Sequence, residues 1–123
     1  MANEITVTME LDLVNGDLER NASVSALQFD QTTGAALWNT VNVGFAADEA
    51  IVTTELTALG WCFMRNLDST NYVEWGPDNG GSLVPCGRIE AGEVAMFRLS
   101  PAITFRAQAN TAAVELDILI LDN

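Results

Sequence analysis

The hydrophobic centre of this sequence is the run Gly60-Trp61-Cys62-Phe63-Met64-Arg65-Asn66-Leu67-Asp68-Ser69-Thr70-Asn71-Tyr72-Val73-Glu74-Trp75-Gly76. An apolar segment opens it, a polar segment interrupts it, and a short Tyr-Val-Glu-Trp segment closes it. Asn and Asp side chains bond the nearby backbone and tolerate left-handed conformations, so residues 66–71 are interpreted as the turn of a central hairpin. Alternation gives its first strand two faces, with Trp61, Phe63 and Arg65 opposite Cys62, Met64 and Asn66. Both faces are apolar near Gly60, which indicates a central strand covered on two sides.

Working outward, most of the remaining chain has the spacing of short strands. Glu4 to Val14 alternates strictly between apolar and polar residues, which predicts a half-buried strand with one wet face. Asn15-Gly16 then predicts a tight hairpin turn. Further strands are predicted at residues 24–30, 37–45, 51–56, 89, 94–99, 103–109 and 114–121, with a single helical turn at residues 46–50 and an irregular loop from Gly76 to Gly87.

These signals predict an all-β protein with eight to ten short strands and no long helix. The expected architecture is an antiparallel β-sandwich, with a jelly roll as the favoured arrangement. The length of 123 residues suits one domain, so residues 1–123 are expected to form a single sandwich.

The charge balance limits the classes of partner. The chain has a formal net charge of -12, with five Arg and no Lys or His. Binding of nucleic acid phosphates requires many cations, so no contact with nucleic acid is expected. No apolar run approaches the length that spans a bilayer, and the polar start of the chain does not resemble a signal peptide, so no membrane partner is expected.

Catalytic and metal-binding constellations are hard to assemble from these residues. A serine nucleophile would lack both a His and a Lys base, and the apolar neighbours of Cys62 would raise its pKa. Asp68 with Glu74 could act as a catalytic carboxylate pair. Asp78-Asn79-Gly80 or Asp48-Glu49 could offer oxygen ligands to Ca²⁺. None of these groups has the residue spacing of a known catalytic or calcium-binding motif. No enzymatic activity and no cofactor are therefore expected, whereas Cys62 and Cys86 are left open between a disulfide and buried free thiols.

A high apolar content in so acidic a chain suggests an interface with a partner. The hydrophobic fraction is 49% and the mean hydropathy is +0.18. In the last strand, Leu119 and Leu121 are apolar on the face where Glu115 and Asp117 are polar. The predicted interface residues are Trp38, Trp75, Leu119 and Leu121, together with the strand cations Arg65, Arg98 and Arg106. Each also has an alternative interpretation, namely burial under a loop for the apolar side chains and an ion pair within the chain for the cations.

Several segments resemble small virion proteins of tailed bacteriophages. The resemblance is carried by Gly60 to Phe63, by Arg65-Asn66-Leu67-Asp68 followed by Asn71-Tyr72-Val73-Glu74, by Gly87-Arg88-Ile89-Glu90-Ala91-Gly92-Glu93-Val94-Ala95-Met96-Phe97-Arg98-Leu99, by Phe105 to Ala109 and by the closing apolar strand. It covers roughly Gly60 to Asp122. Such proteins are short β-sandwiches or jelly rolls without enzymatic activity, which serve as capsid decoration, connector or tail components.

Three functions follow as expectations. The first is a decoration (cement) protein on the outer surface of the assembled head, made in the host cytoplasm, with the major capsid protein lattice as partner and a homotrimer as the favoured oligomer. The second is a tail or head-tail connector component, which would need a long loop or terminal arm, and Gly76 to Gly87 is the candidate for it. The third is a carbohydrate-binding β-sandwich module in which Trp38 and Trp75 form a stacking platform.

Overall fold

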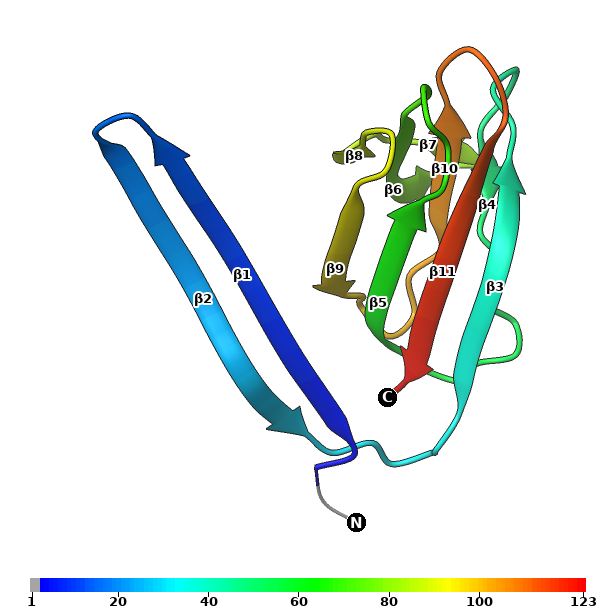
Figure 1. Ribbon diagram of the computed structural model, residues 1–123. Helices are drawn as coiled ribbons and strands as arrows, with labels where there is room; N and C mark the ends of the chain where they lie inside the picture. The colour runs from blue at the N-terminus through cyan, green and yellow to red at the C-terminus, as the bar shows by residue number, and fades with distance from the viewer. Residues whose placement is uncertain (1–2) are drawn as a thin grey trace. The chain divides into compact units, whose positions relative to one another are not determined.

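The computed structural model describes residues 3–123 and divides the chain into two compact units (Figure 1). One unit ends at Thr33, and the other is Gly34–Asn123. The sequence predicted a single domain over residues 1–123, of which Met1 and Ala2 lie outside the described residues. Every helix or strand assigned within residues 3–123 is a strand, which confirms the all-β class.

The N-terminal unit is one long hairpin of strands β1 (Ile5–Asn15) and β2 (Leu18–Phe29). The strands pair in antiparallel register from Ile5 opposite Phe29 to Asn15 opposite Leu18. The tight turn is confirmed one residue later than predicted, because Asn15 still pairs with Leu18 and the turn residues are Gly16, with φ of 60°, and Asp17. The register shifts once between Val7 and Met9, beside a second left-handed residue, Ala26, whose N–H donates to Thr8 Oγ1 at 3.0 Å.

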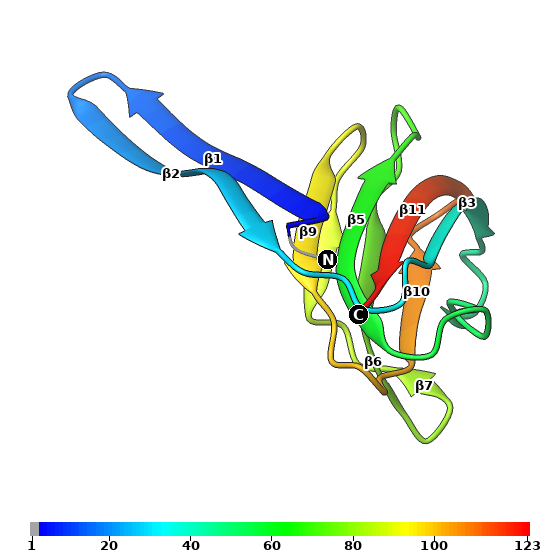
Figure 2. The ribbon, with the colours of Figure 1, turned by 90° about the horizontal axis from the view of Figure 1, so that it is seen from below.

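The C-terminal unit is a sandwich of two antiparallel sheets (Figures 1 and 2). The four-stranded sheet has the order β3 (Ala36–Val43), β11 (Val114–Asp122), β5 (Leu59–Asn66) and β9 (Val94–Arg98). The five-stranded sheet has the order β4 (Glu49–Ala50), β10 (Phe105–Ala109), β6 (Val73–Asn79) and β7 (Ser82–Leu83), and β8 (Gly87–Ile89) also pairs with β6. The β-sandwich is thereby confirmed, and the jelly-roll arrangement stays a prediction.

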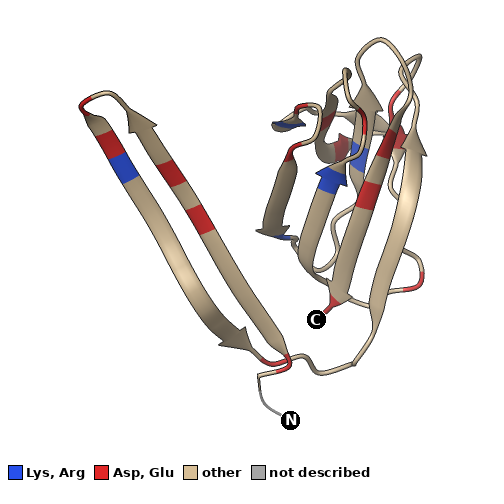
Figure 3. Ribbon diagram, viewed as in Figure 1, with Lys and Arg blue, Asp and Glu red and all other residues tan. Residues whose placement is uncertain are grey.

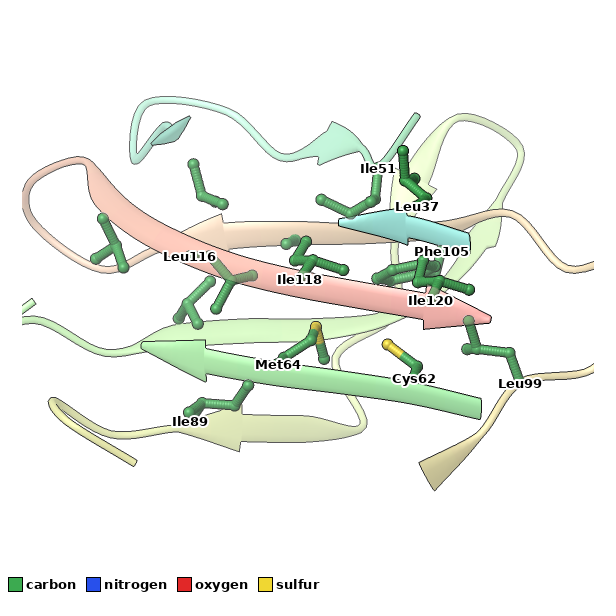
Figure 4. Close-up of a cluster of buried hydrophobic side chains, with 14 of the residues drawn as sticks. Leu37, Ile51, Cys62, Met64, Ile89, Leu99, Phe105, Leu116, Ile118 and Ile120 are labelled. Carbon is green, nitrogen blue, oxygen red and sulfur yellow. The ribbon is translucent and has the colours of Figure 1, made fainter. Parts of the chain in front are cut away.

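The core lies between the two sheets, where apolar residues at every second position of facing strands meet (Figure 4). The four-stranded sheet contributes Leu37, Val43, Cys62, Met64, Val114, Leu116, Ile118 and Ile120, and the five-stranded sheet contributes Val73, Ile89, Phe105, Ala107 and Ala109. The predicted division of β5 into two faces is confirmed, because Cys62, Met64 and Asn66 are all buried.

The predicted central hairpin is wrong, because β5 and β6 belong to different sheets. Strand β5 pairs with β11 and β9, whereas β6 pairs with β10, β7 and β8. The buried Asn66 explains the crossing, since its amide donates to Asn71 O at 2.8 Å and to Ile89 O at 3.1 Å. Asp68 Oδ1 then accepts from the N–H groups of Thr70 and Asn71. The polar residues therefore form the predicted turn, but the turn carries the chain from one sheet to the other.

Four further predictions also differ from the structure. Residues 46–50 form no helical turn, because the last two of them, Glu49 and Ala50, form strand β4 and pair with β10. Residues 51–56 form no strand. Gly76 to Gly87 is not irregular throughout, because β6 extends to Asn79 and pairs there with β7. Eleven strands are assigned over residues 3–123, where eight to ten were expected. The physical reason is that pairing with a neighbouring strand overrides local propensity in short polar segments.

Gly76 is expected to be intolerant of any side chain. A Cβ atom at this position would lie 1.9 Å from the backbone oxygen of Val84, so Gly76→Ala forces the backbone to shift. Overpacking of this kind costs typically about 1–3 kcal/mol, and we expect a loss of that size in urea unfolding. Gly44→Ala is the control, because a Cβ atom there meets nothing within 4 Å. Equal unfolding midpoints for the two variants would contradict the packing of β6 against Val84.

Candidate interaction surfaces

The N-terminal hairpin has one continuous apolar face that remains exposed. Its register places alternate residues of the two strands on the same side. This face, called the hairpin face from here on, comprises Met9, Leu11, Leu13, Leu18, Val24 and Leu27, all of them exposed. Leu11 reaches 76% exposure. Strand β1 was predicted to be half-buried, and from Thr8 onward this is wrong, because both of its faces are exposed.

The opposite face of the hairpin is largely polar by the register of its strands, and Figure 3 shows acidic residues along both strands. Glu10 and Asp12 lie on the opposite face, and the amide of Asn21 donates to both carboxylates, at 3.2 and 3.1 Å. The hairpin is therefore amphipathic across its thickness. An isolated two-stranded hairpin is marginally stable in water, so an apolar face of this length is a candidate contact surface.

A second apolar surface lies on the outer side of the four-stranded sheet. Trp38 pairs with Leu119, Leu119 with Phe63, and Phe63 with Met96, so four apolar side chains form one row across all four strands. Leu121 extends the row along β11. We call Trp38, Phe63, Met96, Leu119 and Leu121 the outer sheet face.

Trp38 is the most exposed residue of this face, at 70%. Its indole Nε1–H donates to Asp117 Oδ1 at 3.1 Å, across to the neighbouring strand. The polar atom of the side chain is thus satisfied, and the apolar ring remains available to a partner. Aromatic side chains with a satisfied polar atom are typical anchors of protein interfaces.

The outer side of the five-stranded sheet is polar by contrast. Arg106 Nε lies 2.6 Å from Asp48 Oδ1, and its Nη1 lies 3.1 Å from Asp78 Oδ1. Arg88 stacks over the ring of Tyr72, with 3.9 Å from its Cζ to the ring centroid, and lies 3.7 Å from Glu74. The two outer sides of the sandwich therefore differ, and only the four-stranded sheet carries an apolar outer surface.

The Arg106 ion pairs give a pH dependence to the stability of the sandwich. The guanidinium of Arg106 lowers the pKa of Asp48 below its ordinary value of 3.8. A carboxyl whose folded pKa is depressed stabilises the fold above its unfolded pKa, and that stability is lost as the pH falls through the folded pKa. We expect Asp48→Asn to be less stable than the wild type at pH 7 and the difference to shrink below about pH 4. Urea unfolding of both proteins between pH 7 and pH 2.5 measures this, and a constant difference would contradict it.

The structure assigns different environments to the predicted interface residues. Leu119 and Leu121 are half-buried on the outer sheet face with Trp38, and their role in an interface stays a prediction. Arg65 is exposed on the same side, opposite Asp117 and Val94. Arg98 donates to the side-chain oxygen of Asn123, and Arg106 is engaged by the two aspartates described above. Of the two interpretations given for the strand cations, the structure therefore supports the ion pair within the chain for Arg106.

Trp75 does not lie on an outer surface, which corrects its assignment to the interface. It faces inward from β6 opposite Ala107, and its ring stacks on Phe97 with centroids 4.3 Å apart. Trp38 lies on the other sheet and faces outward. The two indoles therefore do not form the stacking platform that was considered for carbohydrate binding.

Both cysteines are free thiols in different surroundings. Cys62 is buried and Cys86 is exposed, and burial raises the pKa of Cys62 to about 12. We expect a maleimide reagent at pH 8 to label one thiol per folded chain and two in urea. Cys86→Ser should then show no label when folded, and labelling of that variant without urea would contradict the burial of Cys62.

The same residues, 3–123, also bear on metal binding and on membrane spans. That part of the chain brings together no group of three or more His, Cys, Asp or Glu side chains suited to a metal ion. It also has no helix with the length and apolar character needed to cross a membrane. A comparison of the chain with protein-family models, with curated proteins and with solved structures found no match.

The hairpin face is the surface that sequence reasoning missed. The signal was present, because strict alternation before Asn15-Gly16 and the apolar residues Ala22, Val24 and Leu27 after it define two amphipathic strands. What the sequence could not indicate is that, within residues 3–123, these two strands form a two-stranded sheet of their own. The sequence offered Gly76 to Gly87 as the candidate for a long loop or arm, whereas the structure makes β1 and β2 a separate two-stranded unit.

Proposed function

We propose that this chain is a structural protein of a tailed-bacteriophage virion, and that it is a decoration (cement) protein on the outer surface of the assembled head. The observation that carries this proposal is the pair of exposed apolar surfaces, the hairpin face and the outer sheet face, on a small acidic protein. A chain with two separate apolar surfaces is suited to holding neighbours together.

The charge of the chain supports the outer side of the head. With a net charge of -12, a position against the packaged genome would place acidic side chains beside phosphates. The proposed partner is the major capsid protein lattice, the proposed assembly is a homo-oligomer with three copies as the favoured number, and the chain is made in the host cytoplasm before it joins the virion.

Binding of the purified chain to heads that lack it tests this proposal. We expect the chain to sediment with assembled heads, to saturate at a fixed ratio to the capsid subunit, and not to bind unassembled capsid protein. Val52→Asp is a suitable control variant, because Val52 is exposed and lies outside both apolar surfaces. Failure of the wild-type chain to sediment with heads would contradict the decoration role.

The N-terminal hairpin favours a second candidate, a ring-forming head-tail connector or a tail component. Such a subunit needs a long arm that reaches its neighbours, and β1 and β2 provide a separate two-stranded unit of suitable length. Under this proposal the bound chain would saturate at a few copies for each particle. The ratio at saturation therefore decides between the two candidates.

A further inference from the structure

We propose that the hairpin face of one copy packs onto the outer sheet face of a second copy. This inference rests on the proposed function, which requires that copies of the chain assemble side by side. It specifies which surfaces of the neighbouring copies meet. Both surfaces are pleated sheets with apolar side chains, and two such surfaces pack face to face at about 10 Å. One contact would cover the two apolar surfaces of the chain at once.

The available area favours an arrangement in which every copy both gives and receives a hairpin. Strand β1 has 11 residues, which gives the hairpin a length of about 37 Å, and two strands are about 10 Å wide. The flat area of the hairpin face is thus about 350 Å², below the roughly 800 Å² that each partner buries in a stable interface. A copy that gives one hairpin and receives another buries about twice as much, as in a reciprocal dimer or a closed ring.

The charges on the two surfaces permit this contact. Arg20 lies opposite Leu13 and is the one charged residue of β1 and β2 on the side of the hairpin face. The outer side of the four-stranded sheet carries Glu115 and Asp117 on β11, next to Leu119 in the alternation of that strand, and also the cations Arg65 and Arg98 on β5 and β9. The hairpin acids Glu10 and Asp12 lie on the opposite side of the hairpin. Packing of the two faces therefore brings a cation toward carboxylates and keeps the hairpin acids away from them.

The connection between the units suits an exchange between copies. Residues 30–35 join β2 to β3 without regular secondary structure, and Gly34 adopts a left-handed conformation with φ of 70°. Six residues span up to about 20 Å when extended. Elements joined by a short connection of this kind are the ones that proteins exchange between identical subunits.

Single charged variants of the full chain test each surface. Leu11→Asp places a carboxylate on the hairpin face, and Val14→Asp places it on the polar side of the same strand, where Val14 is 67% exposed. Leu119→Asp changes the outer sheet face, and Val52→Asp is its control. We expect sedimentation equilibrium to show that the wild type and both controls self-associate, and that Leu11→Asp and Leu119→Asp do so at least 100-fold more weakly.

A mixing experiment identifies which surfaces meet. The Leu11→Asp protein retains an intact outer sheet face, and the Leu119→Asp protein retains an intact hairpin face. The mixture keeps one intact contact, the hairpin of Leu119→Asp on the outer sheet face of Leu11→Asp. The proposal therefore predicts that the mixture associates more strongly than either variant alone and more weakly than the wild type. Urea unfolding confirms that each variant is folded, and Met96→Asp, on the same row at β9, replaces Leu119→Asp if that variant unfolds.

Three results would overturn the inference. A monomeric wild type at high concentration would do so, as would self-association of Leu119→Asp through its hairpin alone, or a mixture of the two folded variants that associates no more strongly than either variant alone. These measurements use purified protein without particles. Their failure is thus distinguishable from failure of the virion role, which shows only in binding to heads.

Discussion

Phe105→Ala is expected to destabilise the sandwich by about 3–5 kcal/mol, the usual cost of emptying a buried aromatic site. Phe105 is 1% exposed and projects from β10 into the space between the two sheets. Small domains are stable by about 5–15 kcal/mol in total, so the variant should lose a large share of its stability. The midpoint of urea unfolding, followed by tryptophan fluorescence, measures the loss.

Phe45→Ala is the matched control for this prediction. Phe45 follows β3 and is 49% exposed, so its truncation should change stability by no more than about 0.5 kcal/mol. The same residue type is thus removed inside and outside the core. If both variants lost the same stability, the packing of β10 against the four-stranded sheet would be wrong.

The double variant Leu119→Asp with Leu121→Asp is expected to remain folded and to lose association. Both leucines lie on the outer sheet face, where alternation along β11 separates them from the buried Ile118 and Ile120. Two carboxylates that must be buried without partners cost several kcal/mol, which weakens binding by at least about 100-fold. Sedimentation equilibrium measures loss of contact between copies, and sedimentation with heads measures loss of the proposed particle binding.

Circular dichroism and urea unfolding distinguish the two possible reasons for such a loss. A native-like spectrum with a normal unfolding midpoint would place the two leucines at an interface. Global unfolding would instead make them part of the core and remove the outer sheet face as a candidate surface. Val52→Asp adds a carboxylate at an exposed position elsewhere and should leave both association measurements unchanged.

Much of the fold could be predicted from the sequence, because local alternation and turn residues carry it. The alternation before Asn15-Gly16 gave β1 and its turn, and the alternation from residue 103 to 109 gave most of β10. Apolar runs flanked by turn residues such as Gly and Asn predicted the bounds of β5 and β11 to within a few residues. These signals depend only on neighbouring residues, which is why sequence analysis detects them.

The pairing of strands could not be predicted in the same way. Sequence proximity favoured a hairpin of β5 with β6, but β5 pairs with the distant β9 and β11. Trp75 was placed outside because the sequence does not show which side of β6 meets the other sheet, and its stacking on Phe97 settles that. The hairpin face is exposed because, within residues 3–123, β1 and β2 form a two-stranded sheet of their own. The residues of the two strands do not reveal this from their local pattern.

The central claim is that the chain is a structural protein present in many copies on the phage head. Quantitative mass spectrometry of purified virions, with the major capsid protein as the internal reference, tests it most directly. A copy number comparable with that of the capsid subunit is the predicted result, and a few copies for each particle would move the chain to the connector or the tail. Absence of the chain from the virion would contradict the claim.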